Sequence, residues 1–135
     1  MRNHMVAVVW FALIVAGNAN AETASGSAQY SKTFTSCMDK SGGVTVEMID
    51  CMNAELVRQD AKLNAEYTLL MGSLSAERKT QLRSTQRAWI TYRDENCNFY
   101  DDPEGGSLAR VQANMCMLQM TAERASELAL FNERH

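Results

Sequence analysis

Cysteines are the residues of this 135-residue sequence with the widest choice of chemistry, because a thiol can form a disulfide, bind zinc or act as a nucleophile. The four are Cys37, Cys51, Cys97 and Cys116. None belongs to a C-x-x-C pair, and the only histidines are His4 and the last residue, His135. Four thiolates can bind zinc without histidine, but these spacings are unlike those of zinc fingers. The even number in a small domain favours two disulfides, and we predict no metal and no cofactor.

Polar side chains that fall on or beside apolar helical stripes form a second candidate group. They are Asp60, Gln86, Arg93, Thr121 and Arg124. A polar residue on such a face needs partners. We predict that Asp60 accepts charge-assisted hydrogen bonds from Arg93 or Arg124, and that Gln86 and Thr121 complete a structural polar network. No second acid pairs with Asp60 and no serine lies in a G-x-S-x-G motif, so no catalytic residue and no enzyme activity is predicted.

An acidic stretch over 101–107, with the sequence DDPEGGS, is the third candidate. Asp101, Asp102 and Glu104 place three carboxylates in one loop, and Ser107 is a suitable N-cap for the helix that follows. Such a loop can attract a cationic protein partner and raise the rate of association. It can equally be an ordinary interhelical turn.

These candidates must be positioned by helices, since apolar residues recur at intervals of three and four. A short helix is expected over 30–39, and long helices over about 45–71, 76–100 and 108–131. Thr45, Ser75 and Ser107 are expected at N-caps, and Gly72 just beyond a helix end. The apolar stripes comprise Ile49, Met52, Leu56, Leu63, Tyr67 and Leu70, then Leu82, Trp89, Ile90 and Cys97, then Leu108, Val111, Met117, Met120 and Leu128.

The predicted fold is therefore all-α: a small antiparallel three-helix bundle with an extra short N-terminal helix, stapled by two disulfides. The methionines are expected to fill its core. In this arrangement all four cysteines lie at one end, and three pairings are possible. Height alone does not exclude a Cys51–Cys97 bond. We favour Cys37–Cys51 and Cys97–Cys116, each joining a helix to its neighbouring segment across a glycine-containing loop.

The N-terminus predicts export. Arg2 precedes an apolar run of 12 residues over 5–16, and the A-x-A pattern of residues 19–21 follows. The run is shorter than the ~20 residues that span a bilayer, so we expect a cleaved signal peptide over 1–21 and no stable membrane insertion. Residues 22–32 are then a flexible mature N-terminus and 33–131 the helical domain. Periplasmic location is expected, and secretion is possible.

The charge balance excludes one class of partner. The sequence holds 13 lysines and arginines against 16 aspartates and glutamates, so its net charge is −3, and loss of Arg2 makes it −4. No run of basic residues gives the positive surface that nucleic acid requires. We therefore predict no nucleic-acid partner.

Four motifs lie along the expected helices. They are Cys51-x3-Glu55-x4-Asp60-x2-Leu63-Asn64-x2-Tyr67, Gln86-Arg87-Ala88-Trp89-x3-Arg93-Asp94-x2-Cys97, Gly105-Gly106-Ser107 and Cys116-x4-Thr121-x2-Arg124-x3-Leu128. Together they resemble the lysozyme inhibitor LprI-like family from about Cys37 to Leu128, and the Q-R-A-W segment is the most specific. The resemblance implies an exported helical domain that binds a lysozyme or another cell-wall hydrolase. One lipoprotein member inhibits lysozyme, and this sequence lacks its lipid-attachment cysteine.

Other functions stay open from the sequence. A periplasmic binding or structural module would use exposed aromatic residues such as Tyr92, Phe99 or Tyr100 rather than the acidic loop. An immunity protein would neutralise a toxin that degrades the cell wall. Inhibition of lysozyme, binding to peptidoglycan and genomic neighbourhood are the observations that separate these possibilities.

Overall fold

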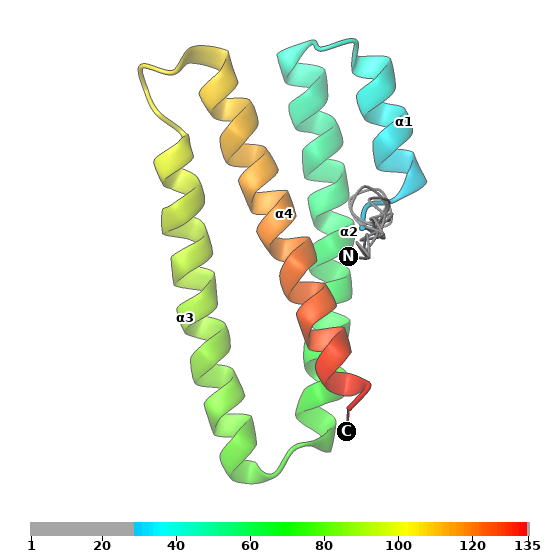
Figure 1. Ribbon diagram of the computed structural model, residues 1–135, viewed down its shortest axis with the longest axis vertical. Coiled ribbons are helices and arrows are strands. Elements are labelled where there is room, and N and C mark those ends of the chain that lie inside the picture. The colour runs from blue at the N-terminus through cyan, green and yellow to red at the C-terminus, as the bar shows by residue number, and fades with distance from the viewer. Residues whose placement is uncertain (1–28, 135) are drawn as a thin grey trace, which may run out of the picture.

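The computed structural model describes residues 29–134, which form four helices and, within this range, no strands (Figure 1). The helices are α1 (Lys32–Ser41), α2 (Thr45–Ser73), α3 (Ala76–Tyr100) and α4 (Gly106–Asn132). The predicted all-α fold, with one short helix before three long antiparallel ones, is confirmed. The predicted signal peptide lies outside the described residues, as does most of the segment expected to be flexible. None of the described helices is both long and apolar enough to cross a membrane.

Side chains and a glycine cap several helix ends, and the cap at Ser75 is the one that was predicted. Ser75 is the N-cap of α3, where its side chain accepts a hydrogen bond from the backbone N–H of Arg78. Ser31 caps α1 in the same way, through the N–H of Phe34. Gly42 ends α1 in the left-handed conformation with φ 56°, which a glycine adopts without strain.

Three expected caps are wrong. Thr45 is the first residue of α2, after Val44 at the N-cap, because Gly42 and Gly43 turn the chain early enough for the helix to begin there. Gly72 lies inside α2, which ends at Ser73. The connection to α3 is so short that the extended Leu74 alone separates this end from Ser75, the N-cap of α3. Ser107 lies in the first turn of α4, because a tight turn within the acidic loop places Gly105 at the N-cap.

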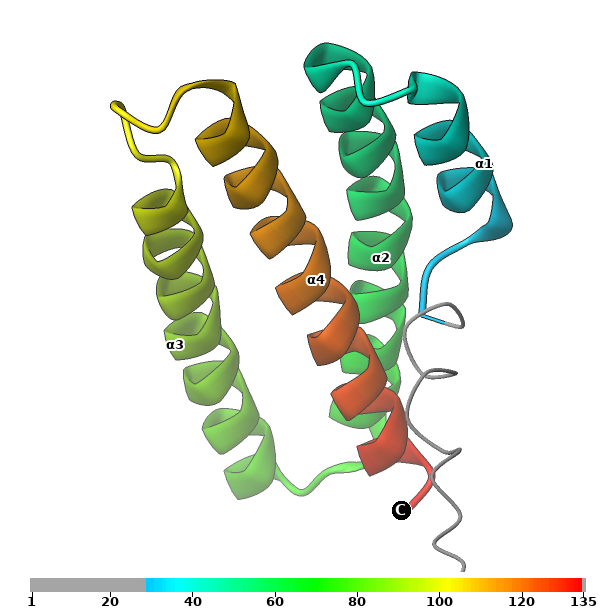
Figure 2. The ribbon, with the colours of Figure 1, turned by 45° about the horizontal axis from the view of Figure 1, so that its top comes forward.

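Helix α4 lies between α2 and α3 (Figures 1 and 2). It packs along α2 and also against α3, whereas α1 covers the other side of α2 and α2 hardly touches α3. The reason is composition. Helix α3 buries only Gln86 and Cys97, so it has no continuous apolar stripe for two partners. Helix α4 buries seven residues, three of them alanines that allow close approach: Ala109, Leu118, Thr121, Ala122, Arg124, Ala125 and Leu128.

The core has two parts. One joins Phe34, Cys51, Met52 and Leu118, and the other joins Leu63, Leu70, Ala125 and Leu128. Two predicted stripe residues are outside it. Ile90 is 39% exposed because α2 does not cover α3, and Leu108 is 63% exposed because it follows the acidic loop.

The cysteines pair as favoured. Cys37–Cys51 ties α1 to α2, and Cys97–Cys116 joins α3 to α4, with Cα–Cα distances of 5.7 and 5.4 Å. The α1–α2 and α3–α4 turns lie at the same end of the molecule (Figure 1), and each disulfide closes a loop that contains one of these turns. No cysteine among the described residues is free.

Candidate functional site: an acidic loop and two polar clusters

The loop between α3 and α4, residues 101–105, is exposed throughout. It is also hydrogen-bonded to itself. The side chain of Asp102 accepts the N–H of Glu104 at 2.9 Å, and its backbone carbonyl accepts the N–H of Gly105 at 3.0 Å. The N–H of Asp101 donates to the carbonyl of Asn98 at 3.1 Å. The Cys97–Cys116 disulfide joins the helices on either side of the loop and so constrains both of its ends.

Large apolar side chains flank this acidic loop. Phe99 is 85% exposed, Leu108 63% and Tyr100 47%. Asp101, Asp102 and Glu104 form no ion pair with any residue of 29–134. An apolar centre beside unpaired charges is the usual make-up of a protein-binding surface.

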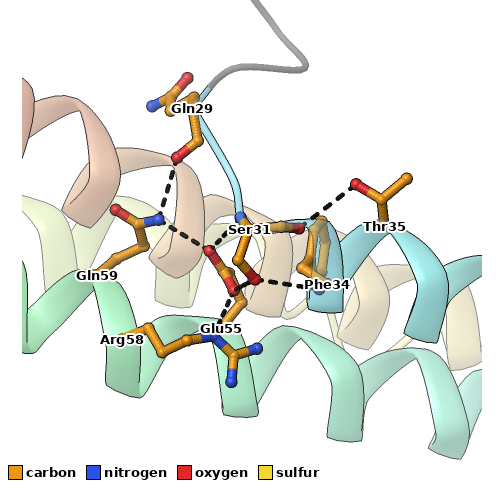
Figure 3. A network of polar contacts seen from close by, with 7 residues as sticks. All are labelled: Gln29, Ser31, Phe34, Thr35, Glu55, Arg58 and Gln59. Carbon is orange, nitrogen blue, oxygen red and sulfur yellow. Dashed lines mark hydrogen bonds and ion pairs between the residues drawn. The ribbon is translucent and has the colours of Figure 1, made fainter.

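A buried carboxylate, Glu55, organises the contact between α1 and α2 (Figure 3). Its Oε1 accepts hydrogen bonds from the backbone N–H of Ser31 at 2.9 Å and from the Gln59 amide at 2.8 Å. Its Oε2 accepts the Ser31 hydroxyl at 2.6 Å and Arg58 Nε at 2.7 Å. Gln59 also donates to the carbonyl of Gln29 at 3.1 Å, so the residues just before α1 are fixed against α2. We call these residues the Glu55 cluster.

These hydrogen bonds keep the Glu55 carboxylate charged. Burial alone would raise its pKa, but the side chain of Ser31, the amide of Gln59, the backbone of Ser31 and the guanidinium of Arg58 together lower the pKa to about 2. The neighbouring Tyr30 packs edge-on against Phe34. Burial, and the negative charges of Glu123 and Glu55, raise the pKa of its phenol.

The second polar cluster surrounds Trp89, between α3 and α4, and we call it the Trp89 cluster. Arg124 Nε donates to the Gln86 side-chain oxygen at 3.0 Å, and Arg93 donates to the Thr121 hydroxyl at 3.3 Å. Both guanidinium groups lie over the Trp89 ring, 5.0 Å from its centroid for Arg93 and 5.9 Å for Arg124. The structure thus brings together four of the five residues expected to form a polar network.

The fifth, Asp60, does not join them, and the predicted bonds to Arg93 and Arg124 are wrong. Asp60 is exposed and accepts a hydrogen bond from Asn64 at 3.1 Å. The arginines instead pair with acids on their own helices, Arg93 with Asp94 at 2.8 Å and Arg124 with Glu127 at 2.6 Å. Because α3 packs on α4 and not on α2, Asp60 and Arg93 lie on opposite walls of a groove.

Glu55 and Gln59 were missed by the sequence reasoning, although a signal for them exists. Cys51, Glu55, Gln59 and Leu63 follow one another at intervals of four and share one buried face of α2. No set of three or more histidine, cysteine, aspartate or glutamate side chains within residues 29–134 is arranged to hold a metal ion.

Comparisons with known proteins add a family match. A family model described as lysozyme inhibitor LprI matches residues 37–128. The chain is also similar to an uncharacterized protein of Rhizobium meliloti (strain 1021), with 29% identity over 92 residues. That match covers 58% of this chain and 66% of the relative, a little less than two thirds of its length. No solved structure matches the chain.

Proposed function

The chain belongs to the lysozyme inhibitor LprI family, as its motifs predicted, and from this membership we propose that it binds and blocks a lysozyme or a related cell-wall hydrolase. The proposal includes export of the chain from Glu22 onward, which would bring it to the compartment where such hydrolases act. N-terminal sequencing of the exported protein should begin at Glu22.

The observation that carries the proposal is the acidic loop. Its three carboxylates, on Asp101, Asp102 and Glu104, have no cationic partner among the described residues. Lysozymes are commonly cationic, so attraction between the two surfaces speeds their encounter. The hydrogen bonds of Asp102 and the Cys97–Cys116 disulfide fix the loop before binding, which reduces the entropy lost when a partner docks.

The exposed apolar residues beside the loop give the surface its second component. Charge at the edge of an interface mainly sets the rate of association, whereas a desolvated aromatic anchor supplies much of the affinity. Phe99, at 85% exposure, is the most exposed of the apolar residues beside the loop. We therefore place Phe99 at the centre of the docking surface and the three acids at its rim.

The test is a lysozyme assay on cell walls with the oxidised chain from Glu22 to His135, titrated over c-type, g-type and i-type enzymes. Dose-dependent inhibition with a stoichiometric complex is expected. Changing Asp101, Asp102 and Glu104 together to Ser should weaken inhibition mainly through a slower association rate. Phe99→Ala should weaken it mainly through faster dissociation.

A matched control separates the loop from net charge. Asp39, Glu77 and Glu133 are exposed acids outside the loop, and their joint change to Ser removes the same charge. Inhibition by this control variant should match that of the unchanged chain. Inhibition that the loop variant retains in full, with its helicity intact, would exclude the loop as the docking surface, and no inhibition of any lysozyme class would exclude the proposed function.

A further inference from the structure

The groove between α2 and α3 is not used by the proposed docking surface. Its volume is about 350 Å³, at the lower end of the roughly 300–1,000 Å³ range of small-molecule pockets. Asp60, Asn64 and Tyr67 line it from α2, and Arg83, Arg87 and Trp89 line it from α3, with Arg93 at the same wall. The motifs that begin at Cys51 and at Gln86 therefore face each other across this groove.

The groove is cationic although the chain is acidic. Three arginines line it, Arg83, Arg87 and Arg93, of which Arg93 is paired with Asp94. The acid in the lining is Asp60, while the whole chain has a net charge of −3. Arg83 and Arg87 form no ion pair within residues 29–134. Their guanidinium groups can present paired N–H donors, which match the oxygens of a carboxylate or a phosphate. An anion is the group that this wall recognises best.

Asp60 on the opposite wall and the two aromatic rings favour a second kind of ligand group, one with hydroxyls and an apolar face. Asp60 keeps one carboxylate oxygen free of described partners, and such an oxygen accepts hydrogen bonds from hydroxyl groups. Tyr67 and Trp89 are half-buried and offer flat apolar faces. Hydroxyl donors on a ring with an apolar face, combined with a negative charge, describe an acidic sugar.

We propose that this groove binds a short saccharide that carries an anionic substituent, either a carboxylate or a phosphate. Arg83 and Arg87 hold the anionic group, Asp60 accepts hydroxyl hydrogens, and the ring of Trp89 packs on the sugar. Arg93, which also lines the groove, and Arg124 lie over the ring and keep it in position.

Trp89 makes the proposal directly measurable. The sequence has two tryptophans, Trp10 and Trp89, so a chain that begins at Glu22 reports from Trp89 alone. Its fluorescence is followed during titration with three probes: a disaccharide of N-acetylglucosamine and N-acetylmuramic acid, N-acetylglucosamine 1-phosphate, and neutral N,N′-diacetylchitobiose. One or both charged probes should give a saturable change at concentrations up to about 10 mM, about tenfold tighter than the neutral probe. Which of the two binds more tightly identifies carboxylate or phosphate as the preferred group.

Variants tie the signal to the arginines. Arg83→Gln with Arg87→Gln should weaken binding of the charged probe by about tenfold. Lys32→Gln with Arg110→Gln removes the same charge from exposed sites outside the groove and should leave binding unchanged. Raising the salt from about 0.05 to about 0.5 M should weaken binding of the charged probes only.

Three results would overturn the proposal: no fluorescence change with either charged probe, equal binding of the neutral probe, or unchanged binding by the Arg83 and Arg87 variant. The test is independent of the hydrolase assay. The loop variant with Asp101, Asp102 and Glu104 changed to Ser should still bind the sugar, and the arginine variant should still inhibit, so each proposal can fail alone.

Discussion

The Glu55 cluster and the Trp89 cluster both bury charged side chains, but only Glu55 is completely shielded from solvent. Glu55 has a fully buried side chain with four hydrogen bonds, two of them from Ser31, which lies 24 residues away in the sequence. Arg93 and Arg124 pair with the half-exposed acids Asp94 and Glu127 and share one aromatic ring.

This difference separates structural from functional polarity. The four hydrogen bonds to Glu55 use both of its carboxylate oxygens, and the two from Ser31 fix the α1 segment on α2, so the buried carboxylate has no side open to a ligand. The Trp89 cluster is satisfied on the side that faces α4, while its other side forms the wall of a groove. Under our proposal, a buried charge marks an interaction site only where its surroundings remain open.

The strongest test of this comparison is to remove the buried carboxylate of Glu55. Glu55→Ala leaves the Ser31 N–H and the Gln59 amide without their acceptor, and should lower the free energy of unfolding by about 4 kcal/mol. Urea unfolding followed by circular dichroism measures it. Asp60→Ala, on the same helix but exposed, is the control and should change stability by less than about 0.5 kcal/mol. Equal effects would show that Glu55 is not a structural anchor.

Acid should weaken the Glu55 cluster. The pKa of Glu55 is about 2 in the folded chain against an ordinary 4.5, so the unfolded chain binds the proton more readily. Its stabilisation, roughly 3 kcal/mol, is complete above pH 4.5 and is lost as the pH falls toward 2. Unfolding free energies across this range should show the loss. Glu55→Gln should remove that part of the pH dependence, and an unchanged slope would contradict the assignment.

The two disulfides allow a third comparison, because removing either one should lower the free energy of unfolding by nearly the same amount. Replacing Cys37 and Cys51 with Ala should lower the free energy of unfolding by about 3 kcal/mol, and replacing Cys97 and Cys116 should cost about the same, since the loops that they close are of similar length. Only the second change should weaken inhibition of lysozyme, because that bond holds the acidic loop. Equal loss of inhibition from both would mean that global stability, and not loop shape, sets activity.

The smallest expected effect is in the Trp89 cluster. Arg93→Lys keeps the charge but loses the planar contact with Trp89 and the fork that reaches Thr121, which should cost about 1 kcal/mol. Thermal unfolding compared with an Arg110→Lys control measures this difference. A loss as large as that of Glu55→Ala would make the two clusters alike.

Local signals account for the parts of the fold that could be predicted from the sequence. Helix α3 has the predicted bounds because Ser75 is a strong cap and an acidic, glycine-rich loop ends the helix. The disulfide pairing is the favoured one, in which each bond crosses a short glycine-containing loop, although antiparallel helices alone left a Cys51–Cys97 bond open. The place of α4 between its neighbours could not be predicted in this way, because short connections favour packing of helices in chain order. Buried alanines on α4 decide it instead.

The candidate site shows the same limit of sequence-based prediction for a single residue, Asp60. Counting along the hairpin places Asp60 level with Ile90, and both do line one groove. Counting does not fix rotation about the helix axis, where one residue turns the side chain by about 100°. Gln59 faces inward and its neighbour Asp60 faces out, so the buried acid is Glu55, one turn earlier.

The position of α4 also has a kinetic consequence. Helices α2 and α3 hardly touch without it, so the α2–α3 hairpin has almost no core of its own to form early. The contacts that stabilise α2 join residues as distant in sequence as Glu66 and Asn132. We therefore expect the long helices to gain most of their core contacts only when the C-terminal helix docks.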